Sequence, residues 1–360
     1  MSERDWIAHL PAAVAEHVRA LARLPDFPRH LARFREVYYL SQSKDKSAGD
    51  EMAERARRLA PDDPMVRHCT EWSLRHRIRR WHYLIVNDTG RNAVYREALR
   101  RHVHDGMIVF EVGTGTGILA MMAVEAGAAH VYTCECEPLL AEVARENIAR
   151  NGLSDRITVL AKRSNEVEVG RDLPSRADLF VAELVEDGLL GEQVLAITAD
   201  VRARLLLPEA MILPDQIGLR GALVGGPEWS AGFRALPVSG FDVSALDRWG
   251  PSVVPVPRTP GPLLGDDVTV LHFDLMAATA WQTETKTVAA SAKADQVVDG
   301  FLSWIWLRFG AGLEYSNRPP FVSCWTPQLH TFPRSLSVSP SLPLNLLVHH
   351  DGSSVRIWPA

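Results

Sequence analysis

"GMIVFEVGTGTGILAMMAVEAG" (residues 106–127) joins an apolar run to an alanine-rich run through three closely spaced glycines. The first run is typical of a buried strand and the second of a helix. Gly113, Gly115 and Gly117 allow the backbone between them to turn tightly and to approach a ligand closely. The first N–H groups of the following helix stay free to bind that ligand. The stretch therefore predicts a strand–loop–helix unit that holds a nucleotide-type ligand.

The residues on either side extend this unit into an α/β domain. Strand patterns at 130–135, 156–162 and 178–184 alternate with a helical pattern at 138–152. Such alternation indicates a parallel sheet covered by helices. We expect a Rossmann-like domain over residues 76–207, preceded by an Ala-, Arg- and Leu-rich helical extension over residues 1–75.

The character of the chain changes after Pro208, where prolines and β-branched residues accumulate. Residues 208–360 are predicted to form an antiparallel β-barrel. An insertion at about 225–250 interrupts this domain and contains a short helical pattern around residues 241–249.

Composition excludes several functional classes. The chain has 360 residues, is 46% hydrophobic and 23% charged, and carries a net charge of −5, which suits a globular protein of two or three domains. No basic stripe indicates nucleic-acid binding, and no segment resembles a signal peptide or a membrane span. The 4 cysteines form no C-x-x-C pair and are interpreted as reduced thiols of a cytoplasmic protein, without a metal site.

The spacing of the glycines distinguishes two cofactor classes. A dinucleotide fingerprint needs glycine at position 118, where this chain has Ile118. The observed G-x-G-x-G, with Glu111 just before it, is the form that binds S-adenosylmethionine. Glu135 ends the next strand, where its carboxylate can accept the ribose hydroxyl protons of either cofactor. S-adenosylmethionine is the predicted cofactor.

"VAELVEDGLLGE" (residues 181–192) raises a second question, because Glu183 and Glu192 flank a glycine-bearing turn that leaves an apolar strand. Carboxylates in such a place are costly unless a cation meets them. The alternative is a solvated acidic loop. The pattern favours a site for a cationic substrate.

These motifs together resemble the protein arginine methyltransferase family over roughly residues 80–360. The stretch 111–135 is similar to its cofactor motif, and residues 177–192 to its double-glutamate hairpin, with the two glutamates nine positions apart. "MILPDQIGL" resembles the junction into its barrel, and the insertion at 225–250 its dimerisation arm. The length and sequence of residues 156–184 most resemble those of the monomethylating (type III) branch.

The resemblance implies a role for individual residues. Glu183 and Glu192 would be catalytic, and Arg91 would pair with the carboxylate of the cofactor through a bidentate fork. The implied cofactor-binding set is His82, Arg91, Glu111, Gly113, Thr114, Gly115, Gly117, Glu135, Cys136, Ser164, Asn165 and Glu183. The implied substrate-binding set is His76, Glu186, Cys324 and Trp325.

The chain departs from the family pattern on the substrate side. Cys324 stands where the family's Thr-His-Trp loop has its histidine, beside Trp325, and a thiol is a weaker hydrogen-bonding partner. Tyrosines expected upstream of His82 are absent, and His76 lies near their place. The substrate-side chemistry is therefore expected to differ more than the cofactor side.

The function implied is an S-adenosylmethionine-dependent arginine N-methyltransferase that gives Nω-monomethylarginine. A guanidinium stays charged and is a poor nucleophile, so two carboxylates can grip it and direct one nitrogen at the methyl group. Free L-arginine, as used by bacterial relatives in nitrosourea antibiotic biosynthesis, is slightly favoured over protein arginine as the acceptor. We expect a homodimer with no nucleic-acid or membrane partner. A methyltransferase for another nitrogen or oxygen nucleophile, and a scaffold that binds cofactor without turnover, are the alternatives.

Overall fold

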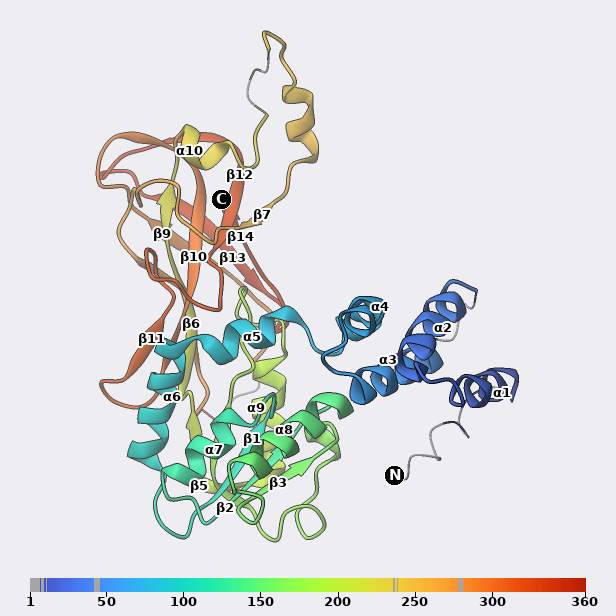
Figure 1. Cartoon of the computed structure of the whole chain (residues 1–360). Helices are drawn as coiled ribbons and strands as arrows, with labels where there is room; N and C mark the ends of the chain where they lie inside the picture. The colour runs from blue at the N-terminus through green and yellow to red at the C-terminus, as the bar shows by residue number, and fades with distance from the viewer. Residues whose placement is uncertain are drawn as a thin grey trace. The chain divides into compact units, whose positions relative to one another are not determined.

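The structure is a computed structural model that describes residues 7, 10, 12–41, 46–235, 237, 239–277 and 281–360 (Figure 1). The chain divides into two compact units, Met1–Tyr83 and Leu84–Ala360. The division falls inside helix α5 (Arg80–Asn87), later than the predicted end of the helical extension at residue 75. Among the described helices, none combines the length and the apolar character that crossing a bilayer requires.

The N-terminal unit is helical, as predicted. Its helices are α1 (Ala12–Leu21), α2 (Phe27–Ser41), α3 (Lys46–Leu59) and α4 (Pro64–Leu74). They bury an apolar core of their own that includes Val18, Leu31 and Met52. Asp63 begins α4 by accepting the N–H groups of Met65 and Val66, which satisfies donors that the first helical turn leaves free.

The second unit begins with a parallel sheet in the order β3-β2-β1-β4-β5, with helices packed against it. The bounds along the chain are α6 (Thr89–His102), β1 (Ile108–Val112), α7 (Ile118–Glu125), β2 (His130–Cys134), α8 (Pro138–Arg150), β3 (Ile157–Leu160), η2 (Ser164–Glu166), β4 (Ala177–Ala182), α9 (Val194–Leu205) and β5 (Leu206–Leu213). The central strand β1 pairs with β2 on one side and β4 on the other, so the segments that follow these strands meet at one edge of the sheet.

An antiparallel domain follows, which confirms the predicted fold class. Its bounds are β6 (Gln216–Val224), α10 (Pro227–Ser230), η3 (Ser244–Trp249), β7 (Val253–Pro255), β8 (Val268–Asp274), β9 (Glu284–Ala290), β10 (Gln296–Arg308), β11 (Glu314–Ser316), β12 (Gln328–Val338), β13 (Leu344–His350) and β14 (Val355–Pro359). One sheet has the order β7-β12-β10-β6-β8, with β11 on β10, and another has the order β14-β13-β9.

The α/β part and the antiparallel part of this unit share one apolar core. Phe110 and Phe180 of the parallel sheet belong to the same buried cluster as Phe309 and Trp325 of the antiparallel domain. Strand β5 continues the parallel pairing with β4 as far as Leu213, past the predicted domain boundary at residue 207. Pro208 does not end the parallel sheet, because β5 lies at its edge, where a missing N–H is tolerated.

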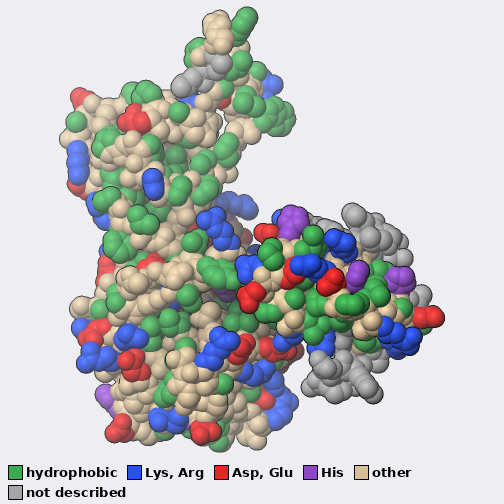
Figure 2. Space-filling model, viewed as in Figure 1, with side chains coloured by type: hydrophobic (Ala, Val, Ile, Leu, Met, Phe, Trp, Pro, Cys, Tyr) green, Lys and Arg blue, Asp and Glu red, His purple; other side chains and the backbone are tan. Residues whose placement is uncertain are grey.

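The insertion forms an arm whose short helix is the 3₁₀ segment η3. Phe241, Leu246 and Trp249 on this arm are 70%, 67% and 81% exposed. Figure 2 shows apolar side chains gathered on it at the top of the view. Trp229 falls within the predicted insertion but is buried in a second cluster of the antiparallel domain, because α10 packs on the sheet there.

Candidate active site

The glycine loop lies at the carboxyl edge of the parallel sheet, directly after β1. Gly113, Gly115 and Gly117 all have positive φ values of 83°, 55° and 85°. A side chain at Gly113 would also meet the Leu184 side chain at 3.4 Å. Glycine is therefore favoured here by the conformation of the backbone, whereas the contact with Leu184 is at an ordinary van der Waals distance.

Glu135 follows β2 and faces this loop. Its Oε2 accepts the Gly115 N–H at 3.0 Å, and its Oε1 accepts the Glu137 N–H at 3.0 Å. Thr114 is buried and its hydroxyl is bonded to that of Thr133 at 2.6 Å, which joins the loop to β2. Backbone amides thus fix the Glu135 carboxylate beside the glycine loop, and Cys136 next to it is exposed.

Glu111 is a carboxylate inside the sheet. It is 1% exposed, and neither side-chain oxygen has a hydrogen-bond partner among the described residues. Burial raises the pKa of Glu111 to about 8, and the charge of Glu135 acts in the same direction. The nearby Thr133 hydroxyl acts against this rise in pKa.

This raised pKa has a consequence for stability. A folded-state pKa of about 8 exceeds that of the unfolded chain, so the folded protein binds more protons between about pH 4.5 and 8. We expect the cofactor-free protein to lose stability relative to Glu111→Gln as the pH rises through this window. The difference should reach at most a few kcal/mol at about 1.4 kcal/mol per pKa unit. Urea unfolding of both proteins at pH 5 and pH 8 measures it, and a difference independent of pH would contradict it.

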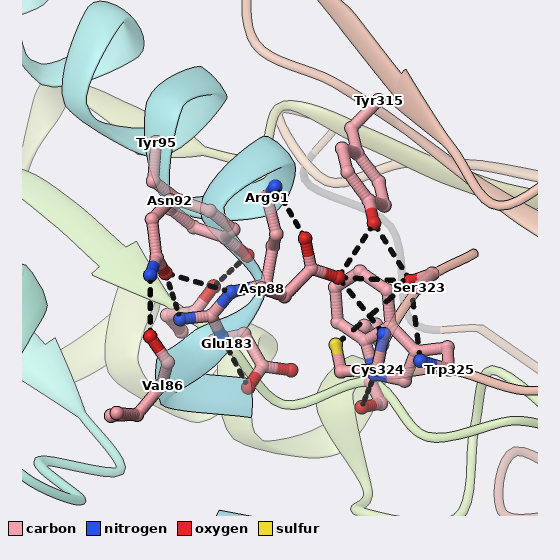
Figure 3. A network of polar contacts seen from close by, with 12 residues as sticks. Val86, Asp88, Arg91, Asn92, Tyr95, Glu183, Tyr315, Ser323, Cys324 and Trp325 are labelled. Atoms are coloured by element: carbon pink, nitrogen blue, oxygen red, sulfur yellow. Dashed lines mark hydrogen bonds and ion pairs between the residues drawn. The ribbon is translucent and has the colours of Figure 1, made fainter. Parts of the chain in front are cut away.

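Arg91 and Glu183 form a buried ion pair (Figure 3). Arg91 lies in the first turn of α6, and its Nη1 donates to Glu183 Oε2 at 3.0 Å. The Nε and Nη2 groups donate to Asn92 Oδ1 at 3.2 and 2.7 Å, and Asn92 is itself held by the Val86 carbonyl. The side chains of Arg91 and Glu183 are 1% and 9% exposed.

The second oxygen of Glu183, Oε1, is buried and has no hydrogen-bond partner among the described residues. Burial raises the pKa of Glu183 to about 6, against the lowering effect of the Arg91 guanidinium and the Val185 N–H. At neutral pH Glu183 is therefore ionised, bound to Arg91 on one side and available as an acceptor on the other.

Asp88 is the point where the antiparallel domain joins α6. Its Oδ1 accepts the Arg91 N–H, as a helix cap does. Its Oδ2 accepts the Tyr315 hydroxyl, the Ser323 hydroxyl and the Cys324 N–H at 2.9, 3.1 and 2.9 Å (Figure 3). Burial would raise the pKa of Asp88, but these donors outweigh it and hold the pKa below its usual range.

The loop at Cys324 and Trp325 has a thiol where the Thr-His-Trp loop has an ionisable histidine ring. Burial raises the pKa of the Cys324 thiol far above neutrality, and the charges of Asp88 and Glu183 act in the same direction. Cys324 contributes its backbone N–H and its thiol to Asp88, beside the hydroxyl groups of Tyr315 and Ser323. Trp325 is 4% exposed, and its indole N–H donates to the Val185 carbonyl at 3.0 Å.

The other predicted residues fall in different surroundings. Glu186 folds back on its own hairpin, where Oε1 accepts the Gly191 N–H at 3.2 Å. Glu192 lies exposed at the far end of that hairpin. Ser164 and Asn165 are in η2 after β3, at the same edge of the sheet as Glu135. His76 and His82 belong to the N-terminal unit, where His76 contacts Asp50 and His82 contacts the Arg79 carbonyl. Their predicted roles stay predictions.

Several residues of the network carried no sequence signal of their own. Asp88 could have been found as a helix cap, because Asp-Thr-Gly precedes a helical pattern. Asn92, Tyr315, Ser323 and Asp187 could not, because each gains its partner from a distant segment. Among the described residues no group of three or more His, Cys, Asp or Glu side chains could hold a metal ion.

The parallel sheet, the G-x-G-x-G loop and the acid after β2 define an S-adenosylmethionine-dependent methyltransferase. Residues 93–205 match the family model described as ribosomal protein L11 methyltransferase (PrmA). The chain is also 38% identical over 248 residues to an arginine N(omega)-methyltransferase of Streptomyces achromogenes subsp. streptozoticus, covering 68% of each chain. It is 28% identical over 287 residues to protein arginine N-methyltransferase 9 of Xenopus laevis, covering 69% of this chain and 34% of that one. It is 41% identical over 140 residues to protein arginine N-methyltransferase 7 of Drosophila erecta, and this match covers 36% of this chain and 20% of that one.

Solved structures share the fold. The Trypanosoma brucei PRMT1 enzyme–prozyme heterotetrameric complex with AdoHcy matches 75% of this chain and 86% of that one, with a TM-score of 0.66 and 22% identity. Arabidopsis thaliana protein arginine methyltransferase 10 matches with a TM-score of 0.62 and 20% identity, covering 74% and 86%. The chain belongs to the arginine N-methyltransferase family. It is an S-adenosylmethionine-dependent enzyme, which confirms the interpretation of the glycine loop and of the resemblance.

Proposed function

We propose that the chain methylates the terminal guanidino nitrogen of free L-arginine and releases Nω-monomethylarginine. The observation that carries this proposal is the second oxygen of Glu183, which is buried and without a hydrogen-bond partner among the described residues. It lies after β4, next to the strand that leads into the glycine loop. A guanidinium N–H is the donor that such a carboxylate accepts best.

Glu183 and Glu192 would act on the guanidinium together. Glu183, held by Arg91, would grip one side and Glu192, from the far end of the hairpin, the other. Gripping its N–H groups from two sides aims one terminal nitrogen at the methyl group that the cofactor supplies, and this positioning contributes much of the rate. Methyl transfer also frees one proton from the attacking nitrogen. Since the pKa of Glu183 is about 6, its Oε1 can take that proton before water does.

Free arginine is proposed over protein arginine on the strength of relatives. The Streptomyces relative, which this chain matches over 68% of its length, is named for arginine alone. The Xenopus and Drosophila relatives named for protein arginine share only 34% and 20% of their length with this chain.

Mass spectrometry tests the acceptor and the product directly. The protein is incubated with S-adenosylmethionine and either L-arginine or an arginine- and glycine-rich peptide. We expect one methyl group on L-arginine, with a kcat/KM at least about tenfold above that for the peptide. Preference for the peptide would overturn the acceptor, and a second methyl group would overturn the product. No methylation of either, with S-adenosylhomocysteine still bound, would favour a scaffold.

We also propose a two-fold symmetric homodimer in which the arm packs on the α/β part of its partner. Phe241, Val243, Leu246 and Trp249 together would form an unusually apolar surface on a monomer. We expect light scattering to give the mass of a dimer at micromolar concentration, and Phe241→Asp with Trp249→Asp to give a monomer. Leu342→Asp, at an equally exposed apolar position outside the arm, should stay dimeric. A monomeric wild type with full activity would contradict this proposal.

A further inference from the structure

The hairpin between β4 and α9 is held in a conformation that its own sequence does not favour. Leu189 and Gln193 have positive φ values of 80° and 60°, although neither is glycine. Each such residue costs about 1 kcal/mol or more. Gly188 and Gly191 are closed in by Glu186, which a side chain at either position would meet within 2.8 Å. Hydrogen bonds within the hairpin, such as that from the Gly191 N–H to Glu186, stabilise this shape together with contacts from outside it.

Those contacts come from one segment of the antiparallel domain. Asp187 Oδ1 accepts the Thr326 N–H at 2.7 Å, and its Oδ2 accepts Gln328 Nε2 at 3.4 Å. The Trp325 indole donates to the Val185 carbonyl at 3.0 Å. Residues 325–328 thus contact the hairpin at Val185 and Asp187. Both positions lie between the two glutamates that are proposed to hold the substrate.

Asp187 is not a generic surface acid. It is half-buried, and its partners are a backbone N–H and a side-chain amide, with no cation among the partners that the described residues give it. Burial raises its pKa, and the charge of Glu186 adds to this, while the Thr326 N–H lowers it. An amide or an alanine would cost less free energy to bury in these surroundings than a carboxylate does. We therefore infer that Asp187 acts through the groups that it holds in place.

We propose that Asp187 is a positioning residue that ties the double-glutamate hairpin to residues 326–328 and thereby sets how Glu183 and Glu192 face the guanidinium. This rests on the proposed role of those two glutamates. Asp187 itself touches neither substrate nor cofactor. Its effect on turnover arises because Leu189 and Gln193 return to more favourable backbone conformations when the hairpin is released, and Glu192 moves with them.

Hydrogen exchange and kinetics together test the proposal, with Asp215→Ala as the matched control. Asp215 is a buried acid that also joins two elements, through Arg308 and the Gly310 N–H, and it follows β5, the neighbour of β4, with both of these partners outside the hairpin. In the protein bound to S-adenosylhomocysteine, Asp187→Ala should speed exchange of peptides spanning 184–193 at least tenfold, and Asp215→Ala should not. Asp187→Ala should also lower kcat with arginine about tenfold or more, with cofactor affinity kept within about twofold.

Asp187→Asn is the conservative variant. Its amide oxygen can still accept the Thr326 N–H, but its NH2 group replaces the oxygen that accepts from Gln328, so this second hydrogen bond is lost. Its exchange rate and kcat should lie between those of wild type and Asp187→Ala. Unchanged hairpin exchange in Asp187→Ala, or equal acceleration in Asp215→Ala, would overturn the proposal. Because exchange is measured without the acceptor, it stays decisive even if the two glutamates prove not to bind arginine.

Discussion

Glu183→Gln and Glu192→Gln should each lower kcat with arginine by about a hundredfold or more. Each substitution keeps the volume of the side chain but removes one negative charge from the proposed guanidinium clamp, and the loss of one preorganised electrostatic contact has this size. Steady-state kinetics measure kcat, and calorimetry with S-adenosylhomocysteine measures cofactor binding. Glu192→Gln should leave that binding unchanged, whereas Glu183→Gln should alter it modestly through Arg91, which Glu183 contacts.

Glu186→Gln is the control within the same hairpin. Its carboxylate accepts the Gly191 N–H, which an amide oxygen can also accept, so kcat should fall about tenfold or less. A methyltransferase for another nucleophile would tolerate Glu192→Gln. If Glu192→Gln turns over arginine at a rate near that of the wild type, the two-glutamate clamp is wrong.

The pH dependence of kcat/KM tests whether Glu183 must be ionised. Since its pKa is raised to about 6, the carboxylate is the form present above this pH and is lost as the pH falls through it. The kcat/KM of the wild type should therefore fall below about pH 6, because this ratio reports groups of the free enzyme. Glu183→Gln should lack that limb in whatever activity remains.

Arg91→Ala should reduce both stability and turnover. It leaves the Glu183 carboxylate buried without its cation, and breaking a buried ion pair in this way costs about 3–5 kcal/mol of the free energy of unfolding. Urea unfolding at pH 8 should show this loss, and the loss should shrink at pH 5 because Glu183 then takes up a proton. We expect kcat/KM to fall on the order of a thousandfold, since both the cofactor side and the clamp lose a charge.

A double variant separates the two effects. Arg91→Ala combined with Glu183→Gln removes the unpaired charge, so most of the stability should return while activity stays lost. Arg91→Lys keeps the positive charge but cannot make the fork to Glu183 and Asn92, and it should fall between wild type and Arg91→Ala. A loss below about 1 kcal/mol in Arg91→Ala would show that the pair contributes little.

Sequence alone determined the architecture and the cofactor side of this enzyme. Alternation of strand and helix patterns, the glycines at 113, 115 and 117, and acids at the ends of two successive strands are local features. Because the carboxyl ends of neighbouring parallel strands meet at one edge, spacing along the chain was enough to bring Gly115 and Glu135 into contact.

Tertiary structure alone decided how the substrate side is held. Arg91 meets Glu183 across 92 positions, and Asp88 meets Tyr315 across 227. The sequence indicated that Cys324 removes a hydrogen-bonding ring, but not that Tyr315, Ser323 and the Cys324 N–H would together satisfy Asp88. No feature of the sequence indicated a partner for Asp187, whereas the fold pairs it with Thr326 and Gln328. The partner of a buried polar group depends on which distant segments cross beside it, and no local periodicity carries that information.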